Sequence, residues 1–126
     1  MKPLRILDLT ASALILLTGV AHTAVGHRAF TETTEARVWF VSAGLLGITA
    51  GLANLARAGA ERPSRLLALA ALSGSLGTFL IGLLLQMTEK PPPIGPASYA
   101  VFAIGLIAAA FALRDLFKPG APRGPA

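Results

Sequence analysis

The sequence contains only two histidines, and one of them, His22, stands inside a long apolar stretch near its C-terminal end. A histidine can exchange protons near neutral pH, ligate a metal, or donate and accept hydrogen bonds. Thr18 precedes it by four positions, and residues four apart lie on the same face of a helix. Three interpretations of His22 stay open: a histidine hydrogen-bonded within a helical bundle, a haem or metal ligand, and a binding-site or proton-handling residue.

A haem or metal site at His22 lacks a second ligand on the same helix. His27 follows five positions later, which turns the two side chains roughly 140° apart around a helix axis. Bis-histidine ligation of haem needs imidazoles that face each other, and the sequence has no third histidine and no cysteine. We therefore expect no cofactor. The candidate residues for a small-molecule pocket are Thr18, His22 and Gln86, because Gln86 is expected at the same depth and could hydrogen-bond His22.

Two other polar residues inside apolar stretches have structural interpretations. Asp8 lies near the start of the first stretch, where a carboxylate complements the positive end of a helix dipole. Arg65 or Arg114 could pair with it from another helix. Asn54 is expected to bridge two helices by a hydrogen bond.

Motifs for enzymatic chemistry are missing from the sequence. It has no nucleophile placed with a base, no paired carboxylates at a catalytic spacing, no phosphate-binding loop and no HExxH metal motif. We therefore predict that the protein is not an enzyme. The net charge of +5 does not indicate nucleic-acid binding, because the basic residues are dispersed in short segments beside the apolar runs.

Four uncharged apolar runs dominate this chain of 126 residues, which is 54% hydrophobic and 13% charged. They cover residues 9–26, 38–56, 66–88 and 91–113, each at or above the roughly 18 residues that indicate a membrane span. A soluble bundle would need a polar face on each helix, and none of the runs has one. A cleaved signal peptide fits the first run poorly because of Asp8, so we expect a retained helix.

The predicted fold is all-α, an up-down-up-down bundle of four transmembrane helices. The helices are expected at about residues 5–26, 36–57, 64–87 and 96–117. They form a single domain over 1–117, and a Pro/Gly-rich cytoplasmic tail follows over 118–126.

The basic residues predict the orientation of this bundle. Eight fall on the side of the two termini, namely Lys2, Arg5, Arg57, Arg62, Arg65, Arg114, Lys118 and Arg123, against Arg28, Arg37 and Lys90 on the other. The positive-inside rule therefore places both termini in the cytoplasm, which for a bacterial protein means an inner-membrane location. Trp39 and Tyr99 then fall at the outer surface, as is typical of an aromatic belt.

Small residues recur at intervals of four along two of the predicted helices. Gly47 and Gly51 form such a pair in the second helix, and Gly74, Thr78 and Gly82 form a row in the third. Small residues let helix backbones approach closely in a membrane. Either these rows pack the four helices of one chain together, or one of them is a docking face for another membrane protein.

The segment 19–27, GVAHTAVGH, followed by 37–40, RVWF, resembles a group of small bacterial four-helix integral membrane proteins. Their first helix typically ends in a pattern like G-x-x-H-S-x-L-G-E, and their second helix opens with a Trp-His pair. This chain has Thr23 for the serine, His27 for the glutamate and Phe40 for the second histidine. The resemblance implies a four-helix membrane fold, and it brings no established activity with it.

Taken together, the sequence predicts a non-enzymatic structural or accessory subunit that packs against itself or a larger membrane complex. The alternative is a small-molecule binding or transport protein that uses an outer pocket around His22. An ion-coupled transporter is disfavoured, because no charged side chain is expected at mid-membrane.

Overall fold

A computed structural model of the chain describes residues 3–29, 35–88 and 96–118. Four helices make up this part of the chain: α1 (Pro3–Ala29), α2 (Glu35–Gly59), α3 (Arg65–Thr88) and α4 (Pro96–Leu116). The prediction of an all-α, up-down four-helix bundle is therefore confirmed. The connections 30–34 and 89–95, and the Pro/Gly-rich tail beyond Lys118, lie outside the described residues.

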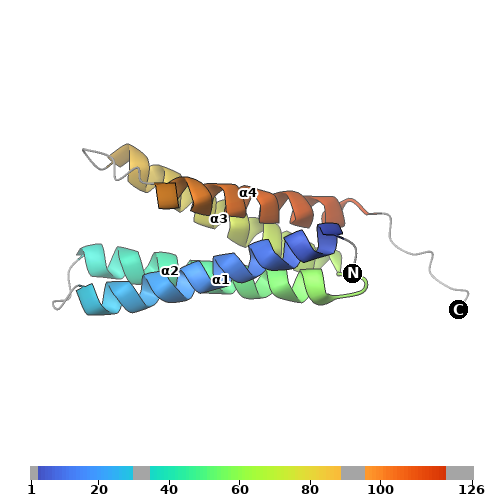
Figure 1. The fold of residues 1–126 in the computed structure, drawn as a ribbon, viewed down its shortest axis with the longest axis horizontal. Helices are drawn as coiled ribbons and strands as arrows, with labels where there is room; N and C mark the ends of the chain where they lie inside the picture. The colour runs from blue at the N-terminus through green and yellow to red at the C-terminus, as the bar shows by residue number, and fades with distance from the viewer. Residues whose placement is uncertain (1–2, 30–34, 89–95, 119–126) are drawn as a thin grey trace, which may run out of the picture.

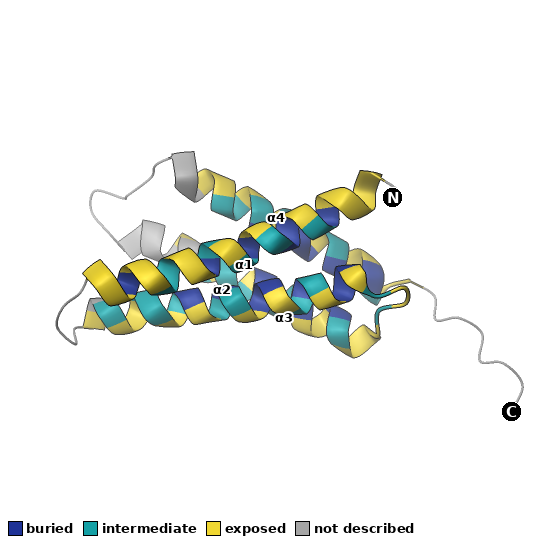
Figure 2. Cartoon of the chain, turned by 60° about the horizontal axis from the view of Figure 1, so that its bottom comes forward, coloured by how far each residue is buried: buried dark blue, intermediate teal, exposed yellow. Residues whose placement is uncertain are grey.

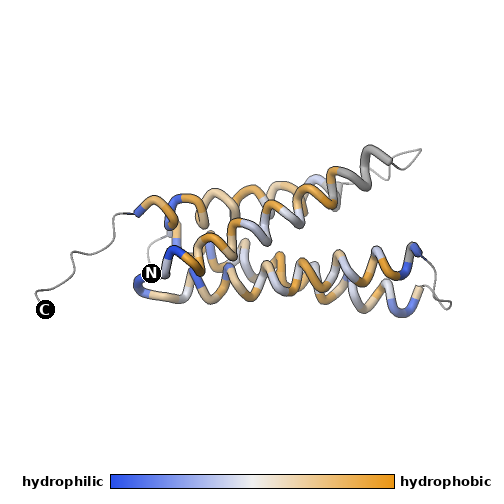
Figure 3. The backbone as a smooth tube through the Cα atoms, turned by 180° about the vertical axis from the view of Figure 1, so that it is seen from behind, coloured by the Kyte–Doolittle hydropathy of each residue, from blue (hydrophilic) through white to orange (hydrophobic). Residues whose placement is uncertain are grey.

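The four helices are arranged as two antiparallel hairpins, α1 with α2 and α3 with α4 (Figure 1). The hairpins converge at the end that carries both chain termini and splay apart toward the other end, as the views from front and back agree (Figures 1 and 3). The short connection 60–64 between α2 and α3 lies at the converging end. The two hairpins are therefore close together at one end of the bundle and apart at the other.

Local sequence accounts for where the helices begin. Pro3 and Pro96 each stand at the first position of a helix, where a missing N–H costs nothing. Glu35 lies in the first turn of α2, where it complements the helix dipole. The hydroxyl of Ser64 accepts a hydrogen bond from the backbone N–H of Leu67, 3.1 Å away, and so caps α3.

The interior of the bundle is built from small side chains, and the large aliphatic ones face outward. Alanines at positions 11, 50, 68, 71, 108 and 112 are at most 3% exposed, and Ile15 is the one large aliphatic side chain among the buried residues described. Leucines, in contrast, are exposed along all four helices. Figure 2 marks exposed positions along the helices, and Figure 3 shows hydrophobic residues throughout them. Such an arrangement suits lipid outside and close backbone packing inside.

Three of the helices are long and apolar enough to cross a bilayer. These spans are Pro3–Ala29, Arg37–Gly59 and Tyr99–Leu116, whereas the described apolar stretch of α3, Arg65–Ile81, is shorter. Three long apolar helices are therefore accompanied by α3, whose apolar stretch is shorter over the residues described. Together with the apolar outer surface, this makes the chain a small helical membrane protein.

Glycines allow α1 and α2 to pack with their backbones nearly in contact. A Cβ atom added to Gly19 would lie 2.5 Å from the backbone nitrogen of Ile48 and 2.7 Å from the carbonyl carbon of Gly47. One added to Gly51 would lie 2.6 Å from the Cα atom of Leu16. Because these neighbours are backbone atoms, they cannot move aside cheaply.

Replacement of Gly19 by alanine is therefore expected to destabilise the α1–α2 hairpin. The added methyl group has no room, and overpacking of this kind costs about 1–3 kcal/mol. The matched control is Gly77→Ala, because an added Cβ there meets only the Leu46 side chain at 3.5 Å. The control should be neutral or stabilised by up to about 1 kcal/mol, since alanine favours the helix. Unfolding in mixed micelles measures both, and equal stability of the two variants would contradict this packing.

Candidate functional site

A buried arginine lies between two aspartates at the converging end of the bundle. The side chain of Arg57, in the last turn of α2, is 0% exposed, and the carboxylates of Asp8 and Asp115 are 4% and 3% exposed. Arg57 Nη1 donates to Asp8 Oδ2 at 3.0 Å and to Asp115 Oδ2 at 2.5 Å, while Nη2 donates to Asp8 Oδ1. We call Asp8, Arg57 and Asp115 the Arg57 cluster. It joins α1, α2 and α4.

Two more cations reach the cluster from its exposed side. Arg114 Nη2 and Lys118 Nζ lie 2.9 Å and 2.7 Å from Asp115 Oδ1, and their side chains are 43% and 54% exposed. Arg57 alone would leave one of its two carboxylates without a neutralising charge. Arg114 and Lys118 supply that charge from the surface.

Asn54 connects the cluster to α3, the one helix that contributes no residue to it. Its side chain lies one turn before Arg57, and its Nδ2 donates to the Ser75 hydroxyl at 2.8 Å and to the Ala71 carbonyl at 3.3 Å, both in α3. The interhelical bridge expected of Asn54 is therefore present. Through Asn54 and Ser75, polar contacts extend from the cluster to all four helices.

The structure corrects two expectations about these residues. Arg57 was expected at the end of the second helix as one of the basic residues that set the orientation, but α2 continues to Gly59 and the side chain of Arg57 is buried. Arg65 or Arg114 was expected to pair with Asp8. Arg114 does so, with Nη2 3.9 Å from Asp8 Oδ2, but the closest partner is Arg57, which was not expected. A buried carboxylate needs a cation close to it. Arg57 is buried beside Asp8, whereas Arg65 is exposed at the start of α3.

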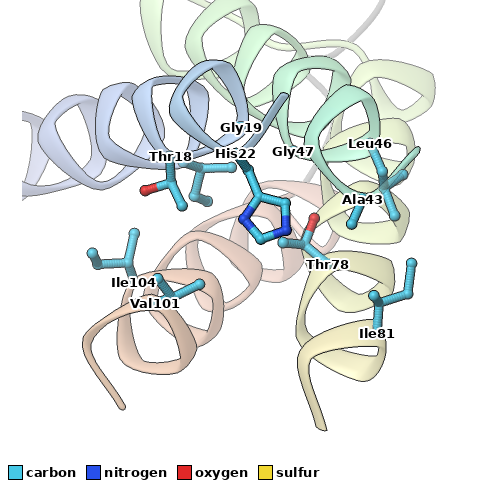
Figure 4. A pocket seen from close by; sticks show the side chains of 11 residues that line it. Thr18, Gly19, His22, Ala43, Leu46, Gly47, Thr78, Ile81, Val101 and Ile104 are labelled. Atoms are coloured by element: carbon cyan, nitrogen blue, oxygen red, sulfur yellow. The ribbon is translucent and has the colours of Figure 1, made fainter. Parts of the chain in front are cut away.

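A second site lies between the hairpins, toward the splayed end. All four helices contribute to a cavity of about 100 Å³. Its lining is apolar apart from Thr18, His22 and Thr78. The other lining residues are Ile15, Gly19, Ala43, Leu46, Gly47, Ile81, Val101 and Ile104. Figure 4 shows the imidazole of His22 projecting into this space from α1, with Thr78 beside it. We call this cavity the His22 pocket.

An aromatic contact holds the His22 ring. It stacks on Phe40 of α2, with ring centroids 3.6 Å apart and an angle of 9° between the ring planes. Within the described residues, no group hydrogen-bonds its ring nitrogens. The Thr78 hydroxyl donates to the Gly74 carbonyl at 2.9 Å, which leaves its oxygen able to accept. The pocket thus offers a few polar groups inside an apolar lining.

The remaining predicted residues divide between the two sites and the helix interfaces. Gly47 lies against Gly19, and Gly74 lies against Ala50, so both serve contacts between helices of this chain. Gly51 does the same against Leu16. The side chain of Gln86 and the surroundings of Gly82 lie outside the described part of the structure.

His27 lies outside the His22 pocket. Its Nδ1 lies 2.9 Å from Arg37 Nη2 at the exposed end of the hairpin. Trp39 and Tyr99, at 57% and 61% exposed, lie near the N-terminal ends of α2 and α4 at the same splayed end. Over residues 3–29, 35–88 and 96–118, no three His, Cys, Asp or Glu side chains gather where a metal ion could bind.

Comparison with known proteins adds no relative. No family model, no curated protein and no solved structure matches this chain. What can be said about function therefore comes from the two sites.

Removal of the Arg57 guanidinium is expected to be among the most destabilising substitutions in the chain. Arg57→Met leaves two carboxylates buried without their main partner, which typically costs about 3–5 kcal/mol. Arg114→Gln removes a cation that is 43% exposed, so its effect should stay within about 1 kcal/mol. Unfolding in mixed micelles at neutral pH gives both values.

A triple variant separates charge burial from side-chain size. In Asp8→Leu/Arg57→Met/Asp115→Leu no buried charge is left, so most of the stability lost in Arg57→Met should return. Wild-type stability in Arg57→Met itself would show that the cluster does not hold the bundle together.

Proposed function

We propose that the protein binds a small, largely apolar molecule with one hydrogen-bonding group in the His22 pocket, and that it does so without catalysing a reaction. The single observation that supports this most directly is the imidazole that projects into an apolar cavity lined by four helices, with no hydrogen-bond partner among the described residues. A polar group exposed to an apolar space is costly unless a ligand or water satisfies it. Water alone would find few further partners there, because the lining is mostly aliphatic.

The position of the pocket supports a ligand that arrives from the bilayer. The hairpins diverge at the end where the pocket lies (Figure 1), and Val101 and Ile104 of α4 line one side of it (Figure 4). A molecule dissolved among the lipid chains meets apolar side chains first and the imidazole last. Phe40, on which the His22 ring stacks, would hold the plane of the imidazole that the ligand contacts.

The proposal can be tested with two probe molecules of the same shape, phenol and toluene. Phenol can hydrogen-bond His22, and one such bond contributes about 0.5–1.5 kcal/mol, so phenol should bind roughly 2- to 12-fold tighter once detergent partitioning is subtracted. In His22→Phe this preference should disappear, while toluene still binds. Val101→Phe fills the pocket and should abolish binding of both probes. Calorimetric titration of the purified protein measures all of these.

His27→Ala is the matched control. It removes the other histidine, which lies outside the pocket, and should leave the preference for phenol unchanged. Equal affinity for phenol and toluene in the wild type, or binding that survives Val101→Phe, would contradict the proposal.

A structural or accessory subunit of a larger membrane complex, or of a homo-oligomer, is the competing proposal. The small-residue rows were its main support, and contacts of Gly47, Gly51 and Gly74 with neighbouring helices explain them within one chain. Reproducible co-migration with a larger assembly after extraction in mild detergent would favour it. The same result would count against the His22 pocket as the functional site.

We also propose that the protein resides in a bacterial cytoplasmic membrane with both termini in the cytoplasm. The support is the distribution of charge: eight of the eleven basic residues fall on the side of the termini. Lipid is then its first partner, along the exposed leucines.

The orientation can be tested by labelling single cysteines, since the chain has none of its own. Ala29→Cys at the end of α1 should react with a membrane-impermeant maleimide in intact cells. Phe117→Cys, just after α4, should react only after the inner membrane is permeabilised. The reverse pattern would place the termini outside.

A further inference from the structure

A second cavity, of about 250 Å³, lies beside the Arg57 cluster at the converging end. Unlike the His22 pocket, it is lined largely by charged side chains: four cations, Arg5, Arg57, Arg114 and Lys118, and three anions, Asp8, Glu61 and Asp115. Its lining therefore carries a net charge of +1. The space exceeds what a single water molecule needs, which is about 10–15 Å³.

Two of the three carboxylates in this cavity, Asp8 and Asp115, are already paired with the protein's own cations, and the third, Glu61, is exposed. Both oxygens of Asp8 accept from Arg57, and Asp115 accepts from Arg57, Arg114 and Lys118. Donor groups, in contrast, remain in excess. Arg57 Nε is buried without a hydrogen-bond partner in the described structure, and Lys118 uses one of its three ammonium hydrogens on Asp115.

Arg5 adds a further donor at the edge of the cavity. Its Nη2 donates to the Gly59 carbonyl at 3.1 Å, which holds the guanidinium over the cavity and leaves its other N–H groups available. A cavity with spare donors, two of its three carboxylates already paired and a positive net charge is suited to an anion rather than to water or a cation.

The depth of the cavity in a bilayer indicates which anion. Helix α1 has 27 residues and is therefore about 40 Å long, whereas the hydrocarbon core is about 30 Å thick. Its first turn, which supplies Leu4 and Arg5 to the cavity, then lies at the level of the lipid head groups. Phosphate groups are the anions found at this depth.

We infer that this cavity binds a phosphate group, held by Arg5, Arg114 and Lys118 beside the buried Arg57. The phosphate can come from an anionic lipid head group or from free inorganic phosphate. This site lies at the converging end of the bundle, whereas the His22 pocket lies toward the splayed end. The inference does not depend on the function proposed for that pocket.

The test uses delipidated full-length protein, with native mass spectrometry to count bound lipids. Phosphatidylglycerol should bind at one saturable site, and phosphatidylcholine with the same acyl chains should bind more weakly. In Arg5→Gln/Lys118→Gln, phosphatidylglycerol should bind roughly 30-fold more weakly, taking the usual contribution of each cation near an anionic head group. The matched control is Arg62→Gln/Arg65→Gln, which removes two exposed cations from the same end without touching the cavity lining, and it should bind as the wild type does.

Titration with inorganic phosphate identifies the source of the group. Thermal stabilisation by inorganic phosphate, but not by chloride, that is lost in Arg5→Gln/Lys118→Gln assigns the site to free phosphate. Stabilisation by phosphatidylglycerol alone assigns it to a lipid. The inference is overturned if neither probe binds in a way that depends on Arg5 and Lys118, or if the control variant weakens binding equally.

Discussion

A fully buried guanidinium in the low-dielectric interior of a membrane bundle must be surrounded by carboxylates, and this requirement fixes three helices relative to one another. Arg57 of α2 meets Asp8 of α1 and Asp115 of α4, and Asn54 extends the contacts to Ser75 of α3. The cations that complete the charge balance stand at the surface, where they remain hydrated. Close packing of small residues also joins the hairpins, as where Gly74 of α3 lies against Ala50 of α2, and the cluster adds charged contacts to this packing.

The rest of the architecture follows from holding the hairpins together at one end. Within the α1–α2 hairpin, glycine contacts bring the backbones close over residues 16–26 of α1, and these contacts do not involve the cluster. Between the hairpins, the described polar contacts gather at the converging end, and the other end diverges (Figure 1). The space between the diverging helices is the His22 pocket. A ligand there would contact all four helices at the level where they diverge from one another.

Much of the fold could be predicted from the sequence, and the sites only in part. Four apolar runs with antiparallel alternation specify a four-helix bundle, and the bridge that Asn54 makes between helices was rightly expected. Asp8 was expected to complement a helix dipole, but α1 begins at Pro3 and its first turn holds no acidic residue, so Asp8 lies further along the helix and pairs with Arg57. The burial of Arg57 was missed because a charged residue at the end of an apolar run gives the same sequence pattern whether its side chain faces water or another helix. The signal that could have found it is that Asp8, Arg57 and Asp115 all stand at helix ends on the same side of the membrane. The stacking of His22 on Phe40 could not be derived, since it depends on the register between α1 and α2.

The most direct test of this account is a distance measurement between the two hairpins with and without the cluster. Spin labels at Leu7 of α1 and Leu113 of α4, both exposed, report on the converging end, and a pair at Leu7 and Ala56 reports on the α1–α2 hairpin itself. In Arg57→Met, the account predicts a longer and broader distance between Leu7 and Leu113 by double electron–electron resonance, with the Leu7–Ala56 distance unchanged. An unchanged distribution between Leu7 and Leu113 would show that the hairpins are held together by something other than the Arg57 cluster.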